Sequence, residues 1–258
     1  MAKTAFITGA SSGIGSALSL ELAARGYDLF LTARRLEALE QVRTQIAGAH
    51  PGRRVEVRRL DVTEDADVAR AITEAAELLG RCDLVVANAG VGSSPRVGEG
   101  DFERNRAIVE TDLVGAMTTV DAAVTLFRRQ DGGGQVVGIS SVAGVRGLPG
   151  SAAYSAAKAG LTVYLESVRA ETYAEPITVT TIAPGYIDTP INRDMKSRPF
   201  LVDVEKGAQI TADLIERGVG YATVPRFPWT LVKPLLRVFP TSWLARSVPQ
   251  RDSATRDG

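Results

Sequence analysis

The sequence predicts a single-domain α/β fold, in which helices cover both faces of a doubly wound parallel sheet. Two observations lead to this class. Six short apolar runs rich in β-branched residues recur along the chain, and stretches with helical periodicity separate them. This repeated order is typical of parallel strands joined by right-handed crossovers. A chain of 258 residues with 45% hydrophobic residues is long enough to bury one such sheet between two helical layers.

The expected elements follow in chain order. The apolar runs predict six strands, over residues 4–8, 28–32, 54–58, 83–88, 135–140 and 178–183. Helical periodicity predicts the first three connecting helices, over residues 15–26, 36–48 and 65–80. Each of these helices ends at a glycine that we expect to act as its C-cap, namely Gly26, Gly48 and Gly80.

Charge and cysteine content narrow the function classes. Thirty basic and thirty acidic residues cancel, so the overall charge does not indicate nucleic-acid binding. The single Cys82 excludes an internal disulfide framework and fits a reducing compartment. Because Lys3 leads directly into the first apolar strand, the sequence leaves no room for a signal peptide there, and we expect a cytoplasmic protein. No metal site is predicted.

One short stretch, FITGASSGIG at residues 6–15, fits two different motifs. Its G-x-S-x-G pattern is that of the nucleophile elbow of serine hydrolases, whereas T-G-x-x-x-G-x-G is that of a loop that wraps a dinucleotide. A hydrolase of this kind needs a histidine base, which comes last in the chain order of that fold. The only histidine, His50, precedes the third predicted strand, so the sequence favours the dinucleotide.

The glycine-rich loop has a physical reason for each glycine. The first allows the sharp turn out of the strand, the second lets the backbone approach a pyrophosphate, and the third lets the helix pack closely on the sheet. The free N–H groups of the helix N-terminus then face the phosphates, with two serine hydroxyls as further donors. The cofactor-binding residues expected here are Gly9, Ser11, Ser12, Gly13, Ile14 and Gly15.

The residues after the second predicted strand indicate which dinucleotide binds. An NAD site usually has Asp or Glu there to bond the ribose hydroxyls. Here Ala33 is followed by Arg34 and Arg35, and arginine suits a 2′-phosphate. We therefore expect NADP(H) as the cofactor. The alternative is that the two arginines only solvate the start of a helix.

A candidate catalytic group follows the fifth predicted strand. Ser141 stands at the end of that strand, where ligands bind in such sheets, and Tyr154 and Lys158 share one face of the next helix. Free tyrosine has a pKa of about 10, and a lysine ammonium one helical turn away favours the phenolate form. We expect Ser141 to hold a substrate oxygen while Tyr154 transfers the proton.

These motifs resemble the short-chain dehydrogenase/reductase family, in the correct order from residue 3 to about residue 225. The resemblance implies a Rossmann fold and reversible hydride transfer between a nicotinamide cofactor and an alcohol or carbonyl compound. It also implies a homodimer or homotetramer built on helices near residues 103–129 and 154–173. Besides Tyr154 and Lys158, the further cofactor-binding residues that it implies, in LDVT, NAG and PGYIDT, are Asp61, Val62, Asn88, Ala89, Gly90, Pro184, Gly185, Ile187 and Thr189.

The sequence departs from that family at one catalytic position. The family usually has Asn in the long helix after the fourth strand, in an N-x-x-G pattern, whereas this chain has Asp112 three residues before Gly115. In the family this position meets the catalytic lysine through ordered water and completes a proton path. We expect an ionised Asp112 that stabilises the Lys158 ammonium. The alternatives are a protonated Asp112 that mimics Asn, and a side chain that only bonds nearby backbone.

The expected substrate is an uncharged apolar ketone or aldehyde. The segments that should form its pocket, residues 91–100, 142–150 and 186–204, combine apolar residues with a few arginines and contain no basic cluster. A non-catalytic NADP(H)-binding regulator and a sugar epimerase or dehydratase on the same fold are the alternatives. The regulator would be free to lose the three catalytic residues, and the sequence keeps all of them.

The C-terminal end departs from the alternation of strands and helices. We expect the catalytic domain to occupy residues 1–225, and an apolar, basic extension with a frayed end to occupy residues 226–258. Its apolar stretch, interrupted by Pro234 and Pro240, is too short to span a membrane. Two interpretations stay open. Either the segment lies on anionic lipid, or it packs against the body, a partner subunit or the pocket mouth through Phe227, Trp229, Leu235 and Trp243.

Overall fold

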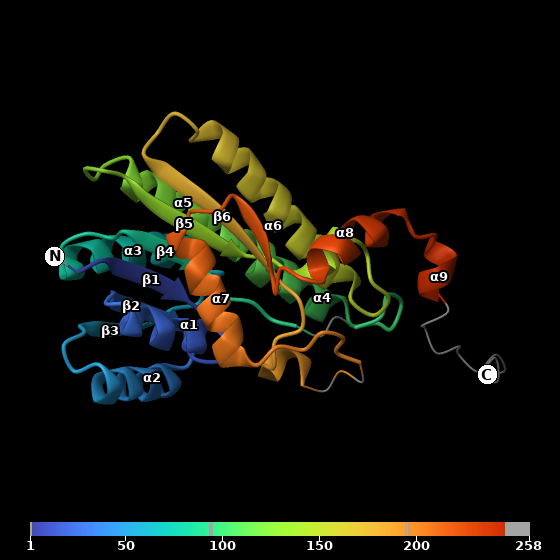
Figure 1. Cartoon of the computed structure of the whole chain (residues 1–258), viewed down its shortest axis with the longest axis horizontal. Coiled ribbons are helices and arrows are strands. Elements are labelled where there is room, and N and C mark those ends of the chain that lie inside the picture. Colours follow the sequence, from blue (N-terminus) through green and yellow to red (C-terminus); the bar gives the residue numbers. More distant parts are fainter. Residues whose placement is uncertain (1, 93–94, 194, 196, 246–258) are drawn as a thin grey trace.

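The computed structural model describes residues 2–92, 95–193, 195 and 197–245. Its centre is a seven-stranded parallel sheet with the order β3-β2-β1-β4-β5-β6-β7, covered by helices on both faces (Figure 1). The predicted doubly wound α/β fold is confirmed. The strands are β1 (Thr4–Thr8), β2 (Asp28–Ala33), β3 (Val55–Arg59), β4 (Leu84–Ala87), β5 (Gly134–Ile139), β6 (Ile177–Pro184) and β7 (Tyr221–Val224).

The sheet differs from the prediction mainly by its last strand. The first six strands lie where the apolar runs predict them, with ends that shift by no more than about one residue. The sequence does not predict β7, because its four residues, YATV, are too few for a periodic pattern to stand out. Its parallel pairing with the end of β6, from Thr181 to Pro184, defines it as a strand.

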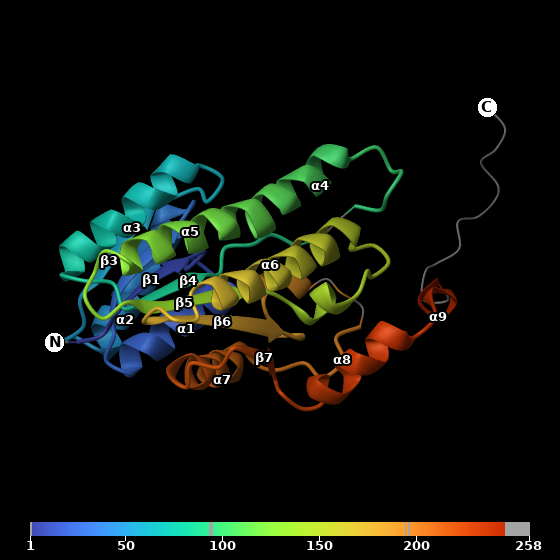
Figure 2. The ribbon, with the colours of Figure 1, turned by 90° about the horizontal axis from the view of Figure 1, so that it is seen from above.

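Two helical layers enclose the sheet, as the view from above in Figure 2 shows. The helices on one face are α1 (Gly13–Ala24), α2 (Leu36–Ala49) and α7 (Val204–Glu216). The helices on the other face are α3 (Asp65–Leu79), α4 (Phe102–Val109), α5 (Gly115–Phe127) and α6 (Ala152–Glu171). The crossovers therefore leave the carboxyl ends of all strands at one edge of the sheet, where side chains from different strands meet.

Two of the three predicted C-cap glycines do end their helices. Gly80 adopts φ +84° at the end of α3, and Gly26 adopts φ +90° two residues after α1. The prediction for Gly48 is wrong, because α2 continues to Ala49 and the N–H of His50 still donates to the Ile46 carbonyl. A glycine inside a helix costs only about 1 kcal/mol relative to alanine, so its presence does not by itself end the helix.

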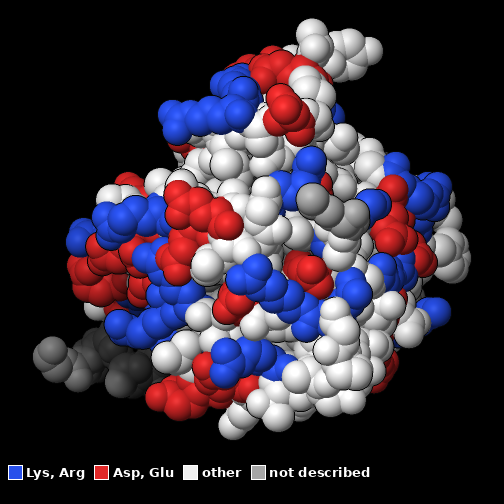
Figure 3. Space-filling view, turned by 90° about the vertical axis from the view of Figure 1, so that its left-hand side faces the viewer, with Lys and Arg blue, Asp and Glu red and all other residues white. Residues whose placement is uncertain are grey.

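The central strand β1 shows why the apolar runs are continuous. Ala5 and Ile7 pack with the helices of one face, including Leu18 of α1. Phe6 packs with the other face and stacks on Phe30, with 5.7 Å between the ring centroids. A strand that is buried on both faces has no polar side. Most charged side chains lie at the surface, and Figure 3 shows basic and acidic groups interspersed on the face nearest the N-terminus.

After β7 the chain forms α8 (Trp229–Val238) and α9 (Thr241–Ala245), at the end of the molecule opposite the N-terminus (Figures 1 and 2). Pro240 separates the two helices, but Pro234 does not interrupt α8, contrary to expectation. This proline is exposed, so water can satisfy the carbonyl that loses its partner. Nowhere in the described chain is a helix long and apolar enough to cross a membrane. The predicted frayed end lies outside the described residues.

Candidate active site

A cleft of about 410 Å³ opens along the carboxyl ends of the strands. It lies where the strand order reverses between β1 and β4, the place at which doubly wound sheets bind their ligands. Every cofactor-binding and catalytic residue predicted from the sequence lines this one cleft. Further lining residues that the sequence does not single out, most of them at strand ends, are Thr32, Leu60, Thr111, Ile139 and Ser140.

The glycine-rich loop between β1 and α1 forms one wall of the cleft. Gly9 has φ +67°, and a Cβ atom there would lie only 2.7 Å from the Cα of Ala89. A Cβ atom on Gly15 would lie 2.3 Å from the Gly9 carbonyl oxygen and 2.4 Å from Nδ2 of Asn88. Neither position therefore accepts a larger residue. The bare backbone and the N-terminus of α1 fit the phosphates of a dinucleotide.

A hydrogen-bond network joins the ends of β1 and β4 beneath this loop. The hydroxyl oxygen of Thr8 accepts from the backbone N–H groups of Asn88 and Ala89, both at 3.0 Å. The side-chain amide of Asn88 in turn donates to the carbonyls of Thr8, at 2.9 Å, and Gly9, at 3.2 Å. These bonds hold the glycine-rich loop at a fixed position beside the neighbouring strand. Asn88 therefore supports the cleft through the backbone.

Arginines gather at the end of the cleft formed by β2 and β3. Arg34 and Arg35 are exposed and line the cleft, and Arg35 reaches the Ser11 hydroxyl at 3.5 Å. Arg59, the last residue of β3, is not predicted from the sequence, and its Nε donates to the Arg34 carbonyl at 3.3 Å. No local pattern singles it out, because its place beside Arg34 depends on the pairing of β3 with β2. This end of the cleft fits an anionic group such as a 2′-phosphate.

Asp61 also lines the cleft, and its carboxylate is bonded within its own turn. Its Oδ1 atom accepts from the backbone N–H of Thr63 at 3.1 Å and from the Thr63 hydroxyl at 2.9 Å. This carboxylate therefore shapes the turn that follows β3, where the resemblance places the adenine. Among the described residues that line the cleft, the acidic ones are Asp61 and Asp112. The end of β2 itself carries no acid for ribose hydroxyls.

Three candidate catalytic side chains meet at the other end of the cleft. Ser141 follows β5 and caps a short 3₁₀ helix, η2 (Val142–Val145), where its hydroxyl oxygen accepts from the Ala143 N–H at 3.1 Å. Tyr154 and Lys158 project from the first two turns of α6, and the lysine Nζ lies 5.7 Å from the centroid of the tyrosine ring. The fold thus brings together the serine, tyrosine and lysine predicted from the sequence.

Asp112 enters this end of the cleft through a local irregularity of its helix. A π-helical segment, η1 (Glu110–Val114), joins α4 to α5, and such segments turn side chains toward functional sites. Its Oδ1 atom accepts from the N–H of Val91 at 2.7 Å, and its Oδ2 atom lies 3.2 Å from Nζ of Lys158. Lys158 also donates to the Ile139 carbonyl at 3.0 Å. Gly90 leaves room for this pair, because a Cβ atom there would lie 3.0 Å from Oδ2.

The buried pair determines the charge state of Lys158. Burial alone would lower the pKa of this lysine, but the Asp112 carboxylate and Tyr154 outweigh that effect and raise it. Lys158 and Asp112 are both almost completely buried, with side chains 5% and 0% exposed. Lys158 therefore carries its proton at neutral pH, as the sequence-based prediction requires, and the direct contact with Asp112 fits an ionised carboxylate.

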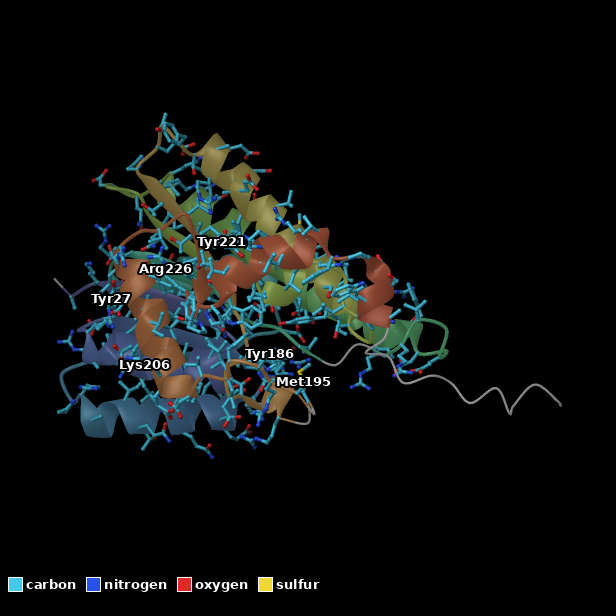
Figure 4. All side chains as sticks on the ribbon, turned by 45° about the vertical axis from the view of Figure 1, so that its right-hand side comes forward. Tyr27, Tyr186, Met195, Lys206, Tyr221 and Arg226 are labelled. Carbon is cyan, nitrogen blue, oxygen red and sulfur yellow. The ribbon has the colours of Figure 1, made fainter. Side chains whose placement is uncertain are left out.

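The three predicted substrate segments contribute unequally to the cleft. Val91 and Ile191 line it, whereas residues 142–150 do not; among them, Arg146 instead donates to backbone carbonyls of the C-terminal helices. Figure 4 shows Tyr186 and Met195 on the segment that passes below α8. Residues 93–94, 194 and 196 lie outside the described part of the chain. The described substrate side of the cleft is thus formed mainly by apolar residues.

Comparison with known proteins identifies relatives of this chain. Residues 3–199 match the family described as short chain dehydrogenase. An uncharacterized oxidoreductase of Mycobacterium tuberculosis is 40% identical over 235 residues, which cover 91% of this chain and 92% of the relative. The structure of an alcohol dehydrogenase from the archaeon Thermococcus sibiricus, complexed with 5-hydroxy-NADP, is similar with a TM-score of 0.77 at 27% identity, over 86% of this chain and 95% of that one. The structure of the actinorhodin polyketide ketoreductase with NADPH is similar with a TM-score of 0.78 at 26% identity. The match covers 86% of this chain and 95% of that one.

Proposed function

The chain belongs to the short-chain dehydrogenase family, and from this premise we propose that it transfers hydride reversibly between NADP(H) and an uncharged apolar ketone or aldehyde. One observation carries the proposal. A single cleft has exposed arginines at one end and the Ser141, Tyr154 and Lys158 side chains at the other. A dinucleotide that extends from the first end to the second would place its nicotinamide beside the candidate proton donor.

The arginine end supports NADP(H) rather than NAD(H). In the described part of the chain, neither Arg34 nor Arg35 forms an ion pair with a carboxylate, and both are exposed. A 2′-phosphate would therefore gain charge-assisted hydrogen bonds without breaking an existing ion pair. Both of the similar solved structures named above contain an NADP-type cofactor.

Each side chain at the catalytic end has a role in the proposed reaction. When bound, the nicotinamide supplies hydride to a carbonyl carbon or accepts it from an alcohol. The Ser141 oxygen already accepts from Ala143, so its hydrogen is available for donation to the substrate oxygen. Tyr154 gives its proton to that oxygen during reduction. The Lys158 ammonium, held by the Ile139 carbonyl and Asp112, stabilises the phenolate that remains.

The charges of the cleft support an uncharged substrate. Among the described lining residues, the cations are Arg34 and Arg35 at the cofactor end and Lys158, whose ammonium Asp112 already neutralises. No described lining cation is therefore left to bind a substrate carboxylate or phosphate. The apolar side chains of Val91 and Ile191 border the same end of the cleft as the catalytic residues. An apolar ketone or aldehyde would bury its surface against them.

Binding and turnover measurements on the full-length protein test this function. Titration with NADPH and with NADH should give at least about tenfold tighter binding of NADPH, and equal affinities would contradict the cofactor assignment. A panel of apolar ketones and aldehydes, each paired with a carboxylated analogue, should show NADPH oxidation only with the uncharged members. Tight NADPH binding without turnover on any member would instead favour the non-catalytic regulator.

A further inference from the structure

The helix α8 is fixed at its start to the substrate side of the cleft. Trp229 is 5% exposed, and it lies so close to Gly185 that a Cβ atom there would be 2.1 Å from the indole Nε1. The ring centroid of Trp229 lies 5.6 Å from that of Phe200, in an edge-on contact, and 6.2 Å from that of Tyr186. Both of these residues belong to the predicted substrate loop. The inner face of α8 therefore packs directly behind Gly185, which lines the cleft, and against the predicted substrate loop.

The rest of α8 is also held in a single orientation. Arg146, which follows η2, donates to the carbonyl of Leu236 at 2.8 Å, to the carbonyl of Phe239, and to the hydroxyl of Thr241 at 3.1 Å. On the same inner side, Nζ of Lys233 lies 3.6 Å from the centroid of the Tyr221 ring. These contacts determine which face of the helix points outward.

That outward face is apolar. Leu231, Leu235 and Val238 are 61%, 53% and 76% exposed, and their spacings of four and three residues place them in one stripe. Beyond the stripe, Phe239 stacks on Trp243 with 5.5 Å between the ring centroids, and Trp243 is 57% exposed. An amphipathic helix that covers a core would have polar residues at these positions. Here the apolar side of α8 extends beyond its buried part, and these three apolar side chains are exposed.

The charges of the segment that contains this stripe have one sign. The sequence contains no Asp or Glu from Arg217 to Arg251. Arg226 and Arg237 are exposed near the two ends of α8. The opposite end of the molecule, shown in Figure 3, mixes acidic and basic side chains. The α8 region thus combines exposed aliphatic and aromatic groups with unopposed positive charge along its own segment.

We propose that the outward face of α8, together with α9, docks on the surface of an anionic phospholipid bilayer. Aliphatic side chains on one stripe would enter the boundary between headgroups and acyl chains, with the exposed Trp243 at the same level. Arg226 and Arg237 would contact lipid phosphates. The hydrogen bonds from Arg146 to the end of α8 and to α9 already hold this face outward, so binding requires no refolding of the helix.

A second copy of this chain fits the same face less well. A two-fold contact brings identical patches together, so it would place arginines opposite arginines with no acid of the segment to pair with them. An anionic bilayer accepts every one of these cations. The observed combination of an aliphatic stripe, an exposed tryptophan and a single sign of charge is typical of helices that lie at a membrane interface.

Docking in this orientation has a consequence that rests on the proposed function. Trp229 connects the inner face of α8 to Gly185 and Phe200, so the docked surface and the substrate side of the cleft lie on opposite faces of one helix. An apolar ketone or aldehyde concentrates in a bilayer. The cleft would then take its substrate from the membrane surface. Vesicle binding itself is independent of catalysis and is measured separately.

Co-sedimentation of the full-length protein with lipid vesicles tests the proposal. The probes are phosphatidylcholine vesicles with about one third phosphatidylglycerol, and vesicles of phosphatidylcholine alone. We expect pelleting with the anionic vesicles, reduced by high salt, and little with the neutral ones. Leu235→Gln should weaken partitioning about tenfold, because it places a polar group in the exposed stripe that the bilayer would bury. Arg226→Gln combined with Arg237→Gln should weaken binding to anionic vesicles only.

The matched control is Leu78→Gln, which changes a leucine of α3 that is 41% exposed, far along the chain from α8. It should pellet like the wild type. NADPH binding by each variant shows that the fold is intact, and loss of turnover alone would count against the proposed function and not against docking. Absence of pelleting, or equal pelleting of Leu235→Gln and wild type, would overturn the proposal. Self-association that Leu235→Gln abolishes, without vesicle binding, would assign the face to a second copy.

Discussion

The two ends of the cleft hold their charges in opposite ways. At the cofactor end, Arg34 and Arg35 are exposed to solvent, and Arg35 has only a long 3.5 Å contact with the Ser11 hydroxyl. At the catalytic end, Nζ of Lys158 lies 3.2 Å from Oδ2 of Asp112, and the side chains are 5% and 0% exposed. The arginines at the cofactor end are therefore hydrated, whereas the lysine at the catalytic end is neutralised by a carboxylate of the protein.

This difference indicates separate functions for the exposed arginines and the buried lysine. An exposed guanidinium keeps its water until an anion arrives, so its removal should change ligand affinity and leave folding nearly unaffected. A buried ammonium requires a partner at all times, because an uncompensated charge in the interior costs several kcal/mol. Mutations at the two ends should thus separate into effects on binding and effects on chemistry.

The largest expected effect is at the catalytic end. Tyr154→Phe removes only a hydroxyl, so turnover should fall by about 10²–10⁴-fold, as is typical when a general acid–base group is lost. NADPH affinity should stay within a few-fold of the wild type, because the arginine end is intact. Steady-state kinetics combined with cofactor titration measures both quantities. A variant with nearly normal turnover would remove Tyr154 from the role of proton donor.

A smaller effect is expected at the cofactor end. Arg34→Ala should weaken NADPH binding by about 10- to 150-fold, the range that corresponds to one charge-assisted hydrogen bond of about 1.5–3 kcal/mol, and should leave NADH binding nearly unchanged. The control is Arg43→Ala on α2, an arginine that pairs with Glu40 and does not line the cleft. Equal loss of NADPH and NADH affinity in Arg34→Ala would mean that the arginine does not contact the 2′-phosphate.

The same contrast explains how much the sequence reveals. The fold follows from local periodicity. The cleft residues follow from motifs at strand ends, because a parallel sheet brings those ends together even when they are far apart along the chain. Arg34, Tyr154 and Lys158 could therefore be found without a structure. Arg59 could not, since its use depends on β3 lying beside β2, which only the pairing of the strands establishes.

Other features depend on tertiary contacts that leave no local pattern. The π-helical segment that turns Asp112 toward Lys158 has an ordinary helical sequence. The sequence therefore predicts that Asp112 stabilises the ammonium, but it does not predict that the two side chains meet directly. The orientation of α8 is likewise set by Arg146 and Trp229, which are far apart in the chain. Its apolar side is wider than the part that is buried, so the sequence does not say which apolar residues are covered.

Asp112→Asn tests the neutralised charge at the catalytic end. Its expected effect is the smallest and the most specific, a shift in the pH profile of alcohol oxidation. In the wild type the carboxylate, acting with Tyr154 against burial, raises the pKa of Lys158, so the lysine stays protonated well above neutral pH. An amide has the same shape and no charge, so it leaves the hydrogen bond from the Val91 N–H in place and removes the negative charge that keeps the buried lysine protonated.

In Asp112→Asn the pKa of Lys158 should therefore fall, because the carboxylate no longer opposes the effect of burial, and the ammonium should lose its proton at a lower pH than in the wild type. The rate of alcohol oxidation, which needs that ammonium to stabilise the phenolate, should then decline on the alkaline side at a lower pH than in the wild type. The control is Asp83→Asn, which changes an acid paired with Arg81 outside the cleft and should leave the profile in place. A purely structural role for Asp112 would lower stability and activity at every pH without moving the profile. Superimposable profiles in the wild type and Asp112→Asn would therefore show that the buried carboxylate does not keep the lysine protonated.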